Sequence, residues 1–206
     1  MSFDSFIAID WSGAKRNYRG IAVAECLPGR SAPGLVESPV GGSRWTRTAI
    51  ADWIIGRLSG SQRLLIGLDF GFGLPYEEDC GYLGGTAPGI ENIFQLWAYI
   101  EARSSNDPDF GCTSFISDAK HSRLFWSFGR QPADWVERKR ETERACKTTD
   151  THPDTLYKLI GSKQVGKASL TGMRVLHHVR SSVGDRVAIW PFEKIRTSAI
   201  VEIYPT

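Results

Sequence analysis

The chain alternates between short apolar runs and segments whose apolar residues recur every three or four positions. The runs have the length and composition of β-strands, and they cover residues 6–10, 21–25, 64–69, 186–191 and 198–204. The run at 64–69 is apolar at consecutive positions, which is typical of a strand in a parallel sheet covered on both faces. This pattern predicts an α/β protein whose first two strands form an antiparallel hairpin.

Helical periodicity fills the stretches between the strands. A helix begins after Ser43 or Thr46 and ends at Gly60, so the first parallel pair of strands is joined by a right-handed crossover. The Gly- and Pro-rich stretch before it has room for one short strand near 34–38. Four further helices are predicted, at 90–102, 118–128, 133–146 and 169–180.

No strand pattern occurs between residues 76 and 154. We therefore expect one domain, residues 1–206, with a helical insertion at about 76–154. Ligands of open α/β sheets bind at the carboxyl edge of the strands, and we expect the insertion to lie over that edge.

Three of the apolar strands each carry a single acid near their carboxyl end: Asp10, Asp69 and Glu202. An ionised carboxylate in such a setting needs a cation or hydrogen bonds. Neighbouring strands are about 4.8 Å apart, so acids at matched heights can converge. Oxygen ligands of this kind suit Mg²⁺ or Mn²⁺, which activate water in phosphodiester cleavage. The alternative is that each acid is a strand-end residue held by amides or by a Lys or Arg.

The composition restricts the possible classes of protein but does not indicate a function. The chain has 206 residues, a formal net charge of +2 and four cysteines without a paired C-x-x-C spacing. This predicts neither a zinc site nor a disulfide framework. No apolar run approaches the roughly 20 residues of a membrane span, and the N-terminus lacks a signal-peptide pattern. We expect a cytoplasmic protein without a membrane partner.

The strand plan resembles the ribonuclease H-like superfamily: an aspartate on the first strand of a hairpin, a helical crossover, and an aspartate ending the next parallel strand. Four short motifs are similar to those of the predicted nucleases called domain of unknown function 429, at residues 8–14, 69–75, 163–166 and 202–205. That family usually has proline where Gly71 stands here. The resemblance implies a mixed sheet flanked by helices and a metal-dependent nuclease.

The resemblance also implies roles for particular residues. Asp10, Asp69 and Glu202 are the implied catalytic, metal-binding acids, with Lys163 near the site. Ser12 and Lys15 in the first turn, together with Lys167, are candidates for binding substrate phosphate. Superfamily members often place a further acid on a later helix, and four residues are candidates for that role here: Glu77, Glu78, Asp79 and Glu91.

Two other functions remain open at this stage. The glycine turns after Asp10 and Asp69 also look like the phosphate loops of actin-like ATPases and sugar kinases. Alternatively, the chain is a non-catalytic module that binds nucleic acid. The predicted insertion carries Trp126 and Trp135 among cations that suit phosphates, but acids are interleaved with them; these cations are Lys120, His121, Arg123, Arg130, Arg138, Lys139, Arg140 and Arg144.

Overall fold

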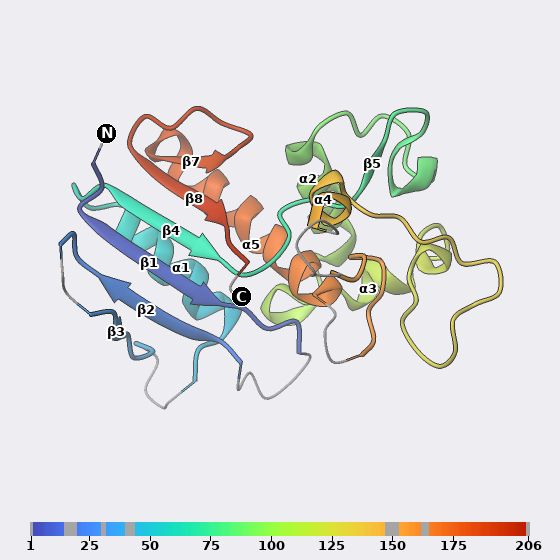
Figure 1. Ribbon diagram of the computed structural model, residues 1–206, viewed down its shortest axis with the longest axis horizontal. Coiled ribbons are helices and arrows are strands. Elements are labelled where there is room, and N and C mark those ends of the chain that lie inside the picture. Colours follow the sequence, from blue (N-terminus) through green and yellow to red (C-terminus); the bar gives the residue numbers. More distant parts are fainter. Residues whose placement is uncertain are drawn as a thin grey trace. The chain divides into compact units, whose positions relative to one another are not determined.

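The computed structural model describes residues 2–14, 20–29, 32–39, 44–146, 153–161 and 165–204. The chain forms two compact units. Unit 1 comprises Met1–Phe70 and Val175–Thr206, and unit 2 comprises Gly71–Arg174. Figure 1 shows the elements of both.

Unit 1 is built on a mixed six-stranded sheet, in the order β3-β2-β1-β4-β8-β7 (Figure 1). The strands β1, β4, β8 and β7 run parallel, and β2 and β3 are antiparallel to their neighbours. Their bounds are β1 Ser5–Asp10, β2 Ala22–Cys26, β3 Gly34–Leu35, β4 Leu64–Leu68, β7 Val187–Trp190 and β8 Ser198–Glu202. The prediction of an α/β protein with an N-terminal hairpin is confirmed.

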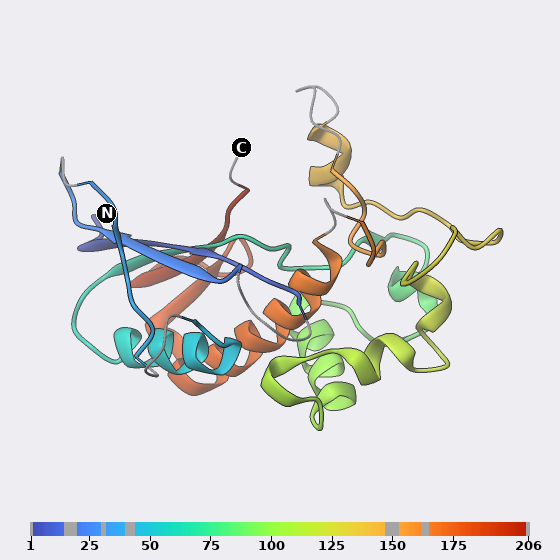
Figure 2. The same cartoon turned by 90° about the horizontal axis from the view of Figure 1, so that it is seen from below.

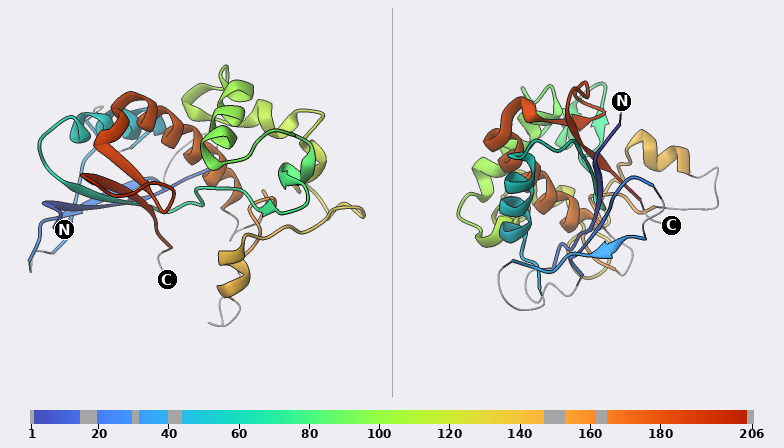
Figure 3. Two further views of the ribbon diagram at one scale, coloured as in Figure 1. Left: turned by 90° about the horizontal axis from the view of Figure 1, so that it is seen from above. Right: turned by 90° about the vertical axis from the view of Figure 1, so that its left-hand side faces the viewer.

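Two helices pack on one face of this sheet (Figures 2 and 3): α1 (Arg47–Leu58) and the C-terminal half of α5 (Gly166–Val183). The N-terminus of α1 is capped by Thr46, whose side chain accepts a hydrogen bond from the Ala49 N–H at 3.0 Å. This confirms the predicted crossover helix. A single-turn 3₁₀ helix, η5 (Gly184–Arg186), leads from α5 into β7.

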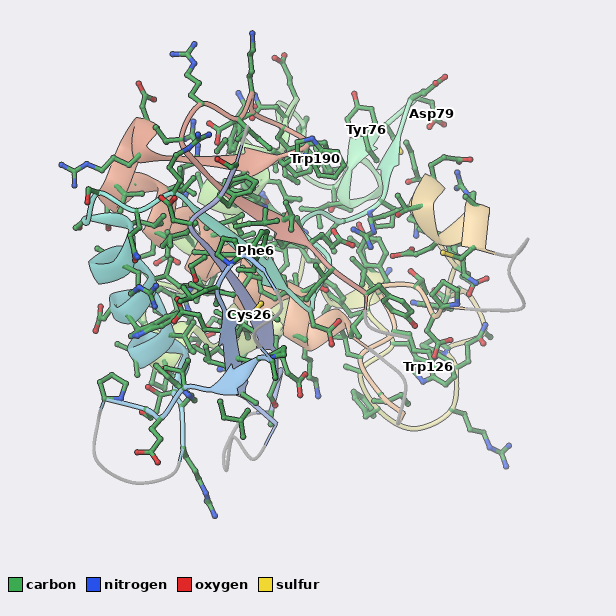
Figure 4. All side chains as sticks on the ribbon, turned by 60° about the vertical axis from the view of Figure 1, so that its left-hand side comes forward. Phe6, Cys26, Tyr76, Asp79, Trp126 and Trp190 are labelled. Carbon is green, nitrogen blue, oxygen red and sulfur yellow. The ribbon has the colours of Figure 1, made fainter. Side chains whose placement is uncertain are left out.

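The other face of the sheet is here called the open face, because the helices described in unit 1 leave it uncovered. Burial along β1 alternates accordingly: Ile7 and Ile9 are buried, whereas Phe6, Ala8 and Asp10 on the open face are exposed. Figure 4 marks Phe6 and its partner in the ladder, Cys26. The expectation of a sheet covered on both faces is not met within this unit.

Unit 2 consists mainly of helices and loops. Its longest complete helix, α2 (Ile93–Ser104), begins with a capping box and matches the prediction at 90–102. A small hairpin of two strands, near Tyr76 in Figure 4, was not predicted. The other elements are β5 Tyr76–Glu77, β6 Gly81–Tyr82, η1 Leu83–Gly85, η2 Pro108–Phe110, α3 Thr113–Ser117, η3 Ser122–Leu124 and α4 Glu141–Ala145.

Two predicted helices of unit 2 are wrong. At 118–128, the Asp118 side chain accepts from the Lys120 N–H at 2.8 Å, so it forms a local turn in place of helical hydrogen bonds. Further on, Trp126 pairs with Lys158 in a strand-like bridge. At 133–146, the Arg138 carbonyl accepts a hydrogen bond from the Thr155 hydroxyl, and helix forms only at Glu141–Ala145.

The fully buried His121 joins three segments of unit 2. Its Nδ1 lies 3.1 Å from the Thr86 hydroxyl, and its Nε2 lies 2.9 Å from the Tyr99 hydroxyl. Because Thr86 donates its own proton to the Leu83 carbonyl at 2.8 Å, Nδ1 is the donor and Nε2 accepts from Tyr99. These bonds require the neutral ring, and burial lowers the pKa of His121. The sequence had offered His121 as a surface cation, and its burial overturns that role.

We expect acid to destabilise unit 2 through His121. Below the ordinary histidine pKa of about 6.5, the unfolded chain binds a proton that the folded protein resists. The free energy of unfolding therefore decreases as the pH is lowered. Urea unfolding between about pH 7 and 5 measures this slope. His121→Gln should flatten it. Equal slopes in wild type and His121→Gln would contradict the assignment.

Candidate metal centre

Asp10 and Asp69 lie side by side at the carboxyl ends of neighbouring parallel strands. The register pairs Ile9 with Leu68, and the Asp69 N–H donates to the Ile9 carbonyl at 3.1 Å, which continues the ladder by one residue. Residues paired in this way point to the same face of a sheet. Both carboxylates therefore belong to the open face.

On the open face, next to the two aspartates, Ile203 packs directly over Gly67. A Cβ placed on Gly67 would lie 2.8 Å from the Ile203 side chain, so only glycine fits without a shift. A hollow of about 170 Å³ opens beside the aspartates, with apolar walls. It is lined by Ala8, Ile9, Asp10, Ala22, Val23, Ala24, Leu35, Asp69 and Ile203.

The ionised form of Asp69 is disfavoured in this position. Burial raises its pKa above the usual carboxyl value, and the charges of Asp10 and Glu202 raise it further. Like charges held this close favour either a shared proton or a bound cation. A divalent ion between the two aspartates removes the repulsion, which makes the pair a candidate ligand set.

Glu202 takes a different position from the two aspartates. It pairs with Leu68, so the register assigns it to the helix-covered face, whereas the next residue, Ile203, contacts Gly67 on the open face. In the described ranges, no three His, Cys, Asp or Glu side chains form a group that could hold a metal ion. The structure thus brings together two of the three predicted acids. Metal ligation by Glu202 stays a prediction.

The turn after β1 is held by a residue that the sequence analysis missed. Arg47, the first residue of α1, is almost fully buried. Its guanidinium donates to the Ser12 carbonyl at 3.0 and 3.1 Å and to the Ala14 carbonyl at 2.6 Å. The available signal was its spacing, since Arg47 is a cation in the same helical register as Ile50, Ile54 and Leu58.

Four further residues were predicted to bind substrate or to lie near the site: Ser12, Lys15, Lys163 and Lys167. Ser12 is half-buried in the turn, where its hydroxyl accepts from the Ala14 N–H at 3.2 Å. Lys167 is the second residue of α5 and belongs to unit 2. Lys15 and Lys163 lie outside the described residues.

The candidates for a fourth acid also belong to unit 2. Glu77 forms an ion pair with Arg138 at 3.0 Å, and Glu78, Asp79 and Glu91 are exposed. Figure 4 shows Asp79 at the tip of the β5–β6 hairpin. None of these positions tests their role in metal binding.

Comparison with known proteins gave no match to a family model, a curated protein or a solved structure. The resemblance to domain of unknown function 429 and to ribonuclease H-like nucleases therefore stays a prediction. None of the helices in the described part of the chain has the length and apolar character that a membrane span requires. Function has to be argued from the geometry of the aspartate pair.

Proposed function

We propose that this protein is a divalent-metal-dependent nuclease that hydrolyses phosphodiester bonds at the Asp10–Asp69 pair. One observation carries the proposal: two carboxylates share the open face at the carboxyl ends of neighbouring parallel strands, where burial and the charge of Asp10 raise the pKa of Asp69. Mg²⁺ is commonly held by one or two carboxylates, with water and substrate phosphate completing its shell. The aspartate pair fits this class of site.

Each part of the site has a distinct task in this proposal. Asp10 and Asp69 hold the ion, which supplies an activated water and positive charge for the phosphate. Arg47 fixes the turn beside Asp10, so the carboxylate and the turn's backbone keep one geometry. The apolar hollow beside the aspartates gives a base or sugar next to the scissile phosphate a surface away from water.

A cleavage assay with defined ions tests the proposal. Labelled single-stranded DNA, single-stranded RNA and duplex DNA are incubated with Mg²⁺, with Mn²⁺ or with EDTA, and we expect cleavage only with an ion. The ion should also stabilise the fold, by about 2.7 kcal/mol at a hundredfold excess over its dissociation constant, measured as a rise in Tm.

Three results would contradict the proposal. They are cleavage that is equal in EDTA, the absence of any metal-dependent cleavage or stabilisation, and stabilisation by ATP with Mg²⁺ in place of Mg²⁺ alone. The last result would favour the actin-like nucleotide-binding function. Nucleic-acid binding without turnover would favour a binding module.

A further inference from the structure

A loop of unit 2 carries three aromatic side chains that its own core does not bury. This loop, residues 125–136, follows η3 and is here called the aromatic loop. Phe128 is 82% exposed, and Trp126 and Trp135 are partly exposed. Figure 4 marks Trp126. Large aromatic rings at the surface of a domain often belong to binding sites.

The two tryptophans are held in fixed orientations. Their rings lie 5.7 Å apart in an edge-on arrangement. The Trp126 indole N–H donates to the Gly129 carbonyl at 3.1 Å, and that of Trp135 donates to the Leu124 carbonyl at 2.9 Å. The Trp126 backbone bonds to Tyr157 and Leu159 at 3.0 and 2.8 Å. The indole N–H groups are thus satisfied internally, and the rings are ordered before any ligand arrives.

Cations flank this loop, and they differ from the other cations of unit 2. Arg138, Lys139, Arg140 and Arg144 are each engaged by a glutamate. By contrast, Arg123 and Arg130 are exposed, and within the ranges the structure describes they form no ion pair. Lys158 lies 5.3 Å from the centre of the Trp126 ring while it pairs with Asp154 at 2.8 Å.

The charge balance of the segment favours an anionic partner. Between residues 120 and 136, three exposed cations, Lys120, Arg123 and Arg130, stand against a single acid, the exposed Asp134. The surface is therefore positive beside the aromatic rings. Aromatic faces next to unpaired arginines are the two components of surfaces that bind single strands, where bases stack and phosphates meet cations.

We propose that the aromatic loop binds single-stranded nucleic acid, with bases stacking on Phe128 and Trp126 and phosphates contacting Arg123 and Arg130. In a duplex the bases already stack on one another, so a ring at the surface gains little from them. The inference names the substrate class of the proposed nuclease, and its connection to cleavage rests on that proposed function.

Binding is measured on the full chain in EDTA, by fluorescence anisotropy with a labelled oligothymidylate of about 12 nucleotides. The single strand should bind at least tenfold more tightly than a duplex of the same length, and Phe128→Ala should weaken it about fivefold or more. Arg130→Gln should reduce the slope of log Kd against log salt concentration by about 0.7. Exposed residues of unit 1 supply the matched controls, Phe192→Ala and Arg196→Gln, which should bind as wild type.

Equal affinity for the duplex, wild-type affinity in Phe128→Ala, or no binding of the oligonucleotide would each overturn the inference. EDTA separates this test from the proposed chemistry. Binding that depends on Phe128, without cleavage in Mg²⁺, would support the surface and contradict the nuclease. Cleavage in Mg²⁺, with no effect of Phe128→Ala on binding, would support the nuclease and contradict the binding surface.

Discussion

Replacing Asp69 by asparagine is expected to abolish metal-dependent cleavage and, in the same protein, to raise the Tm of the metal-free fold. The amide keeps the shape of the side chain but removes the charge that burial, Asp10 and Glu202 all disfavour. A carboxyl whose pKa is raised by folding is less favourable, when ionised, in the folded state than in the unfolded chain. At neutral pH its ionised form therefore destabilises the protein, and neutralising it has the opposite effect.

The same change removes half of the proposed ligand set. Without two carboxylates the ion is held weakly, and the loss of its contribution should lower the cleavage rate by about a thousandfold or more. Asp10→Asn should lose cleavage to a similar extent. Higher stability combined with lost activity distinguishes a functional carboxylate from a structural one, because replacing a structural residue lowers stability and activity together.

Two control variants sharpen this test. Glu202→Gln should reduce cleavage less than either aspartate variant, because the register assigns Glu202 to the other face of the sheet. The exposed Asp52 on α1, changed to Asn, should alter neither cleavage nor Tm. Thermal scans in EDTA and cleavage assays in Mg²⁺ provide both readouts. Undiminished cleavage by Asp69→Asn, or a lower Tm than wild type, would refute the assignment of Asp69.

The sequence predicted those parts of the fold that local patterns determine. The apolar runs that end in Asp10, Asp69 and Glu202 are β1, β4 and β8. The predicted crossover makes β1 and β4 run parallel. The carboxyl ends of parallel strands lie at the same edge of the sheet, so Asp10 and Asp69 come to one edge. The apolar spacing of α1, α2 and α5 likewise predicted helices, because the buried apolar residues of each recur at helical spacing.

The register between β4 and β8 could not be predicted from the sequence, and it decides on which face of the sheet Glu202 lies. A shift of one residue between β4 and β8 would move this carboxylate to the open face with Asp69. Nothing in the apolar run at 198–204 distinguishes the two registers, since Ala199, Ile200 and Val201 fit either face. The convergence of three acids was therefore a hypothesis about strand pairing, and pairing depends on contacts far apart in the chain.

The segment 118–140 shows the same limit in unit 2. Its charge and apolar spacing are typical of helix, yet its backbone is committed to partners outside it. Trp126 bonds to Tyr157 and Leu159, and the Arg138 carbonyl accepts from Thr155. Hydrogen bonds to residues so distant in sequence override helix propensity, and a periodicity argument contains no information about them.

Arg47→Met is expected to destabilise unit 1 by about 2–3 kcal/mol and to lower cleavage by about a hundredfold. Methionine fills much of the same buried space but leaves the carbonyls of Ser12 and Ala14 without the donors they have in the wild type. These carbonyls are in the turn that follows Asp10, so their release changes the geometry of the proposed metal site. The stability and cleavage rate of Arg47→Lys should lie between those of the wild type and of Arg47→Met, because an ammonium cannot bridge both carbonyls as the planar guanidinium does.

The control for Arg47 is Arg57, which is on the same helix and forms an ion pair with Glu25 at 2.5 Å. Arg57→Met removes a partner that lowers the pKa of Glu25, so this variant should also lose stability. It should nevertheless cleave at the wild-type rate below its Tm, since Glu25 is far along β2 from the turn after Asp10. Chemical unfolding and cleavage rates, compared at a temperature where every variant is folded, separate the two arginines. Equal losses of activity in both would show that Arg47 supports the fold without positioning the site.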